Sequence, residues 1–155
     1  MDNQSIKKPV SCKLLIYSQL FLGIGALFGG SVLIIDPSGG LINMPLTLLE
    51  HSPFHNFLIP GIILFTVLGV IPCIIAYSLI TGWECKIAGY LNIYNSMHWS
   101  WSYSLYTGFA LIIWISVQVF LIQAVAIIHI VYITLGLLIQ ALSLLPSVQK
   151  YYTQQ

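Results

Sequence analysis

Charge is scarce in this chain of 155 residues, of which only 6% are Asp, Glu, Lys or Arg and 58% are hydrophobic. About a quarter of the residues in a soluble domain are charged, so this composition excludes an ordinary water-soluble protein. Arginine is missing, and the basic residues are Lys7, Lys8, Lys13, Lys86 and Lys150. Because they form no basic patch, nucleic acid is excluded as a partner. The lipid bilayer is the expected environment.

Paired cysteines are also lacking. Cys12, Cys73 and Cys85 are an odd number without a C-x-x-C spacing, which excludes a disulfide framework and a thioredoxin-like redox pair. We expect reduced, structural thiols. No pair of haem-ligating His residues lies within an apolar run either, so no cofactor is expected.

Four long apolar runs predict an all-α membrane protein, with four transmembrane helices in one bundle and one domain over residues 1–155. The first run, Leu14 to Ile35, has no charge and is about 33 Å long as a helix, which is enough to cross a bilayer core. It is too long for a cleaved signal peptide, and no A-x-A-like site ends it. The expected helices cover about residues 14–35, 53–80, 99–121 and 129–145.

The second span is expected to begin at Ser52 and Pro53, because Ser favours the N-cap and Pro the first helical position. Pro60 and Pro72 should bend this span. Residues 41–51, between the first two spans, mix apolar and polar side chains and are expected to lie at the membrane interface.

The third and fourth spans must be separated by a turn that neither Gly nor Pro marks. The run from Leu105 to Leu145 is about 62 Å long as a helix, roughly twice a bilayer core. Its length and the polar residues Gln123 and His129 place the turn near residues 122–128. Asn95 or Ser96 is expected to cap the third helix.

The lysines predict the orientation of the bundle. Four spans place both termini on one side, and if that side is the cytoplasm, all five lysines are cytoplasmic and the outer loops hold none. The positive-inside rule therefore predicts cytoplasmic N- and C-termini.

Small residues on the first helix predict a packing face. Gly25 and Gly29 form a G-x-x-x-G pair, beside Gly30, whereas Leu20 and Leu27 belong to the opposite arc and are expected to face lipid. The expected partner of this face is the second helix, with Pro60 and Gly61, in preference to a second copy of the chain. Polar residues within the spans are expected to form interhelical hydrogen bonds: Tyr77, Ser78, Ser116, Gln118, Thr134 and Gln140.

Aromatic residues are densest between the second and third spans. Trp83, Trp99 and Trp101 are interpreted as an interfacial belt rather than a ligand cage, so exchange of Trp99 or Trp101 for Phe is expected to be mild.

Five residues on the outer side have side chains that could ligate a divalent metal: Asp36, Glu50, His51, His55 and His129. Pro53 interrupts the helical spacing of His51 and His55, and an isolated His at an interface is usually solvated or hydrogen-bonded. No tight metal site is therefore expected.

Three motifs resemble those of a group of small, uncharacterised bacterial membrane proteins with four predicted helices. They are S-P-F-H-N-F-L-I-P-G at 52–61, N-x-Y-N-S-M-H-W-S-W from 92 and L-I-I-W-I-S-V-Q at 111–118. The likeness extends from about Gly30 to Tyr152. It implies a protein of the bacterial inner membrane and carries no activity or catalytic residues.

Two functions are compatible with the sequence. The favoured hypothesis is a non-enzymatic structural or interaction component that packs against copies of itself or a membrane-protein partner, because no span holds a buried acid, Lys or Arg. The alternative is a carrier or redox module for a small apolar molecule such as a quinone. Its pocket would use the bent second helix and the inner aromatic cluster.

Overall fold

The computed structural model describes residues 7–153, in which every regular element is helical. Four helical spans are long and apolar enough to cross a membrane: α1 (Val10–Ile35), a second span over Leu58–Thr81, α5 (Trp99–Ile122) and α6 (Ile127–Leu144). The prediction of an all-helical chain with four such helices is confirmed.

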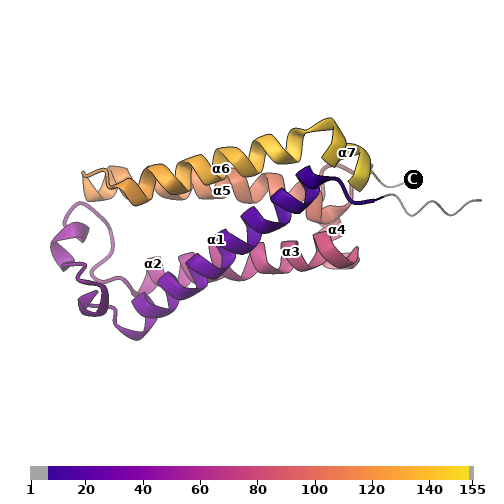
Figure 1. The fold of residues 1–155 in the computed structure, drawn as a ribbon. Helices are drawn as coiled ribbons and strands as arrows, with labels where there is room; N and C mark the ends of the chain where they lie inside the picture. Colours follow the sequence, from indigo (N-terminus) through magenta and orange to yellow (C-terminus); the bar gives the residue numbers. More distant parts are fainter. Residues whose placement is uncertain (1–6, 154–155) are drawn as a thin grey trace, which may run out of the picture.

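Short helices lie at the two ends of the bundle (Figure 1). What we call the distal end holds the loop 36–57, with the 3-10 helices η1 (Gly40–Ile42) and η2 (Leu46–Leu49), and the turn 123–126. The terminal end holds α4 (Lys86–Tyr90), α7 (Pro146–Tyr152) and the two described ends of the chain. Residues 41–51, expected at the interface, thus belong to the loop of the distal end.

The second span begins later than predicted. Its first helix, α2, covers Leu58–Ile63, and the side chain of Asn56 accepts a hydrogen bond from the Leu58 N–H. Ser52 does not cap a helix, because its hydroxyl accepts from the Phe54 N–H within a local turn. The prediction of a helix start at Ser52 and Pro53 is therefore wrong, since a Ser-Pro pair also suits a turn.

A π-helix interrupts the second span. The segment η3 (Leu64–Val70) separates α2 from α3 (Ile71–Thr81), and Pro72 lies directly after it. Pro72 has no N–H to donate to the preceding turn, and its ring crowds that turn. A wider π turn before Pro72 is a common way to relieve such crowding, and Pro60 lies in the first turn of α2, where a missing N–H costs little.

Other boundaries differ by a few residues. Helix α1 starts four residues earlier than predicted, directly after Pro9, because the polar residues of its first turn still fit a helix. The N-cap of α5 is His98, whose Nδ1 accepts from the Ser100 N–H, rather than Asn95 or Ser96. The turn between α5 and α6 spans residues 123–126, inside the predicted interval, and Gln123 takes the left-handed conformation there.

Glycines join α1 closely to the second span. A Cβ added to Gly30 would lie 2.7 Å from the backbone nitrogen of Phe65, and one added to Gly61 would lie 2.8 Å from the Cβ of Leu33. Such contacts bring two backbones together where any side chain would separate them. This packing couples α1 to α2 and η3.

A second glycine contact joins α5 to α6, which run side by side in Figure 1. A Cβ on Gly108 would lie 2.7 Å from the Cγ of Gln140, and one on Gly136 would lie 2.8 Å from the Cγ1 of Ile112. The bundle therefore consists of two closely packed pairs, α1 with the second span and α5 with α6.

The predicted G-x-x-x-G pair does not form the closest helix contact. A Cβ on Gly25 would meet only the hydroxyl of Tyr132, at 2.8 Å, and one on Gly29 would be 3.5 Å from Leu64. Leu20 and Leu27 are half-buried, and Leu27 packs on Gly69, so the expectation that they face lipid is wrong. The small residues of α1 do lie on a packed face of the helix, but that face is centred on the buried residues Gly23 and Gly30 rather than on Gly25 and Gly29.

Candidate functional site: a cavity between the helix pairs

A cavity of about 270 Å³ lies between the two helix pairs, in the distal half of the bundle. Its walls come from all four spans, with Ala26 and Gly29 of α1, Leu68 of η3, Leu111 of α5 and Tyr132 of α6. The small residues of α1 leave this space open, because Gly25 and Gly29 have no side chain to fill it. A second cavity of about 60 Å³ continues toward the distal loop, where Phe54 and Phe57 line it.

The lining of the 270 Å³ cavity contains no Asp, Glu, Lys or Arg, and no Cys. Most of it is aliphatic, from Leu, Ile and Met side chains. Four polar side chains interrupt this apolar surface, namely Trp114, Gln118, His129 and Tyr132. An apolar cavity with a few polar groups is the usual character of a small-molecule site.

His129 lines the cavity from the first turn of α6. Its side chain is buried, and its Nδ1 accepts a hydrogen bond of 3.0 Å from the Ala126 N–H. This bond satisfies a backbone donor in the turn 123–126, where the Gln123 side chain likewise donates to the Phe120 carbonyl. His129 therefore has a structural role with one ring nitrogen and presents the other, Nε2, without a partner among the described residues.

Two further side chains that line the cavity carry hydrogen-bond donors. Tyr132 is one helical turn after His129 on α6 and directs its hydroxyl at Gly25, across the cavity. The indole N–H of Trp114 on α5 is buried and has no hydrogen-bond partner among the described residues. Unpaired buried donors are uncommon in folded proteins, so this group needs an explanation.

The candidate metal ligands are not brought together. Within residues 7–153, no three His, Cys, Asp or Glu side chains lie close enough to hold a metal ion. Asp36 accepts hydrogen bonds from the Ser38 hydroxyl and the Leu41 N–H, which hold the pKa of its carboxyl below the usual value. His129 lies inside the bundle, whereas Glu50, His51 and His55 are exposed in the distal loop.

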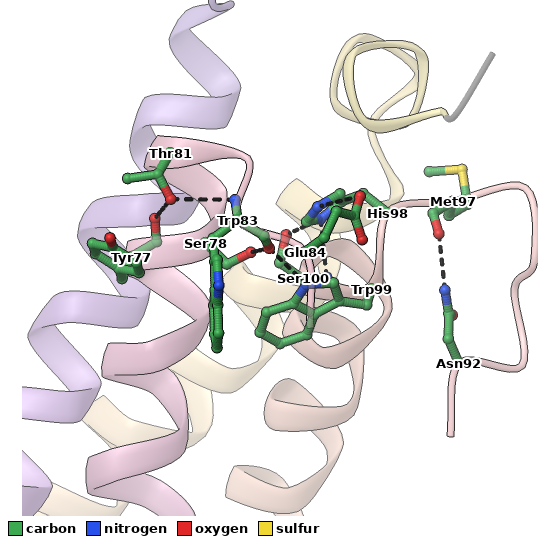
Figure 2. A network of polar contacts seen from close by, with 10 residues as sticks. All are labelled: Tyr77, Ser78, Thr81, Trp83, Glu84, Asn92, Met97, His98, Trp99 and Ser100. Carbon is green, nitrogen blue, oxygen red and sulfur yellow. Dashed lines mark hydrogen bonds and ion pairs between the residues drawn. The ribbon is translucent and has the colours of Figure 1, made fainter. Parts of the chain in front are cut away.

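The tryptophans that were interpreted as an interfacial belt differ in position. Trp99 and Trp101 are buried inside the bundle, and Trp83 is half-exposed at the terminal end. Figure 2 shows the carbonyl of Trp83 accepting hydrogen bonds from the Ser78 hydroxyl and the Trp99 indole, while His98 Nε2 lies 3.2 Å from the Glu84 carboxylate. This network ties the loop after α3 to the start of α5.

The ends of helices at the terminal end are capped by side chains from distant segments. The Leu79 carbonyl, in the last turn of α3, accepts from Lys8 Nζ at 2.7 Å and from the Tyr152 hydroxyl at 2.9 Å. Carbonyls in a last helical turn have no helical donor, so these bonds satisfy them. Burial raises the pKa of Tyr152, as expected for a phenol that donates and stays neutral. These bonds tie both ends of the described chain to α3, beside an open cleft of about 320 Å³.

Several polar residues of the spans do not connect helices. Ser116 and Thr134 bond to carbonyls four residues earlier in their own helices, so the expectation of interhelical bonds is wrong for them. Short hydroxyl side chains often bond this way because the carbonyl is within local reach. Ser78 bonds to the following loop.

Tyr132 and Trp114 were not singled out as site residues by the sequence. Both sit in uninterrupted apolar runs, where an aromatic residue is most often part of the core. The one signal in the sequence was that each side chain ends in a hydrogen-bonding group, which needs a partner within an apolar span.

Comparison of the chain with protein-family models, curated proteins and solved structures finds no match.

Proposed function

We propose that this chain is a multi-pass protein of the bacterial inner membrane, with both termini in the cytoplasm. From Leu14 onward the exposed residues of α1 are aliphatic or aromatic, among them Phe21, Ile24 and Phe28, which suits contact with lipid. All five lysines belong to segments of the terminal end, which supports a cytoplasmic position for that end.

A reporter fused after Gln155 tests this topology. We expect alkaline phosphatase, active only outside the cytoplasm, to be inactive there and green fluorescent protein to be bright. The same reporters placed after Asn43, in the distal loop, should give the opposite pattern. Phosphatase activity at the C-terminus would contradict the proposed orientation.

We further propose that the protein is a non-enzymatic binding protein that holds one small, neutral, apolar molecule. The observation that supports this is the cavity between the helix pairs. A cavity of about 150 Å³ suffices to bind benzene, so about 270 Å³ accommodates a substituted ring or a short piece of chain and is too small for a haem. The lining has no carboxylate or thiol, so binding rather than catalysis is proposed.

Filling the cavity should abolish binding. In Gly29→Leu the new side chain would occupy the cavity, because the nearest atom to a Cβ at Gly29 is 3.5 Å away. We expect an aryl-diazirine photoprobe to label the parent protein saturably on α5 and this variant at least tenfold less. Phe28→Leu, which changes the neighbouring exposed residue, is the matched control and should be labelled like the parent. Equal labelling of all three would favour a purely structural or interaction role.

A further inference from the structure

We infer that the cavity recognises a hydrogen-bond-accepting oxygen, such as a carbonyl, carried on the apolar ligand. This inference rests on the proposed binding function and adds the chemical class of the molecule. The basis for this ligand class is the set of polar groups that line the cavity, most of which are hydrogen-bond donors without a partner.

The tautomer of His129 makes it a donor to the cavity. Because Nδ1 accepts the hydrogen bond from the Ala126 N–H, Nδ1 carries no hydrogen and the neutral ring carries its hydrogen on Nε2. A ligand that meets this nitrogen therefore has to accept. The turn of the chain before α6 thus determines which ring nitrogen faces the site.

The other polar side chains of the lining also favour a ligand that accepts hydrogen bonds. The Tyr132 hydroxyl, directed at Gly25, has no acceptor among the described residues. The Trp114 indole can only donate, and its unpaired N–H is covered by neighbouring atoms rather than exposed in the cavity. Gln118 offers both a donor and an acceptor. Because donors exceed acceptors around the cavity, a ligand with one or two acceptor oxygens satisfies groups that an unsubstituted hydrocarbon would leave unpaired.

Charge restricts the ligand further. No Lys or Arg lines the cavity to pair with an anion, and no Asp or Glu is there to pair with a cation. A charged molecule would remain uncompensated in apolar surroundings, which is strongly unfavourable. The remaining class is a neutral carbonyl compound with an apolar body. The ring of a membrane quinone and the ester region of a lipid both have this chemistry.

The test uses three neutral probes on the purified full-length protein in detergent. Duroquinone has two carbonyls on a tetramethyl ring, durene has the same four methyl groups on a ring without oxygen, and methyl decanoate has one ester on a chain. Binding is followed by titration of the indole N–H signals of ¹⁵N-labelled protein. Trp114→Phe identifies the signal of Trp114.

We expect duroquinone to bind about tenfold more tightly than durene, which corresponds to one or two hydrogen bonds, and to shift the Trp114 indole signal. Tyr132→Phe keeps the ring in place and removes only the hydroxyl. It should weaken duroquinone binding several-fold and leave durene binding unchanged, a difference that general destabilisation would not produce. Tyr17→Phe, at an exposed position of α1, is the control and should change neither affinity.

The outcomes separate the two proposals. Tighter binding of duroquinone than of durene supports the inference, and the tighter of duroquinone and methyl decanoate then assigns the ring or the chain source. Equal binding of duroquinone and durene overturns the carbonyl inference and leaves the proposed apolar binding function intact. Absence of binding by all three probes overturns both.

Discussion

Gly30→Ala is expected to destabilise the bundle by about 2–3 kcal/mol, a typical cost of overpacking at a site that cannot relax. A Cβ at this position would lie 2.7 Å from the nitrogen and 2.8 Å from the Cα of Phe65. Both are backbone atoms of η3, so no side-chain rotation can make room. The helices α1 and η3 would have to separate along their closest contact.

Gly29→Ala is the matched control for this experiment. It adds the same methyl group one residue away, where the nearest atom is 3.5 Å distant and the contact is ordinary. We expect unfolding in mixed detergent micelles, titrated with SDS, to show Gly29→Ala within about 0.5 kcal/mol of the parent. If Gly30→Ala were equally stable, the packing of α1 against η3 described above would be incorrect.

Trp101→Phe is expected to cost about 3 kcal/mol, contrary to the mild effect expected from the sequence. The Trp101 indole donates a 2.8 Å hydrogen bond to the Ser143 carbonyl. Helix α6 ends at Leu144 and Pro146 has no N–H, so this carbonyl has little access to helical donors. Losing the bond leaves a buried carbonyl without a partner, which costs about 1–3 kcal/mol of stability. The smaller ring of Phe also leaves a void, which adds to this cost.

The same SDS titration measures this effect, with Trp83→Phe as the control. Trp83 is 45% exposed, and its own indole N–H makes no hydrogen bond to the described residues, so we expect a loss below about 1 kcal/mol. Similar losses for the two variants would show that the Trp101–Ser143 bond does not hold α5 to α6.

Helix number and approximate position could be predicted from the sequence because length and hydropathy of an apolar run are local properties. Local chemistry was ambiguous at the helix starts. Ser52-Pro53 suits a turn as well as an N-cap, and His98 caps α5 although His is not among the preferred capping residues. The π-helix before Pro72 was not predicted, because a proline in a span allows several responses of the preceding turn.

The cavity could not be predicted because it depends on which faces of the helices meet. The small residues of α1 were recognised, but whether they contact a backbone, as Gly30 does, or border open space, as Gly29 does, depends on the axis of closest approach. The direction of the Tyr132 hydroxyl toward Gly25 joins residues far apart in the chain. The sequence alternative put the pocket at the inner aromatic cluster, where the Trp99 and Trp101 indoles are hydrogen-bonded, whereas the cavity proposed as the site lies in the distal half of the bundle.

Native mass spectrometry of the protein, released from membranes in a mild detergent, tests the proposed binding function most directly. We expect one neutral molecule of low mass bound per chain, retained in Phe28→Leu and lost in Gly29→Leu. A parent protein that carries no such molecule, and that takes up none when apolar compounds are added in excess, would contradict it.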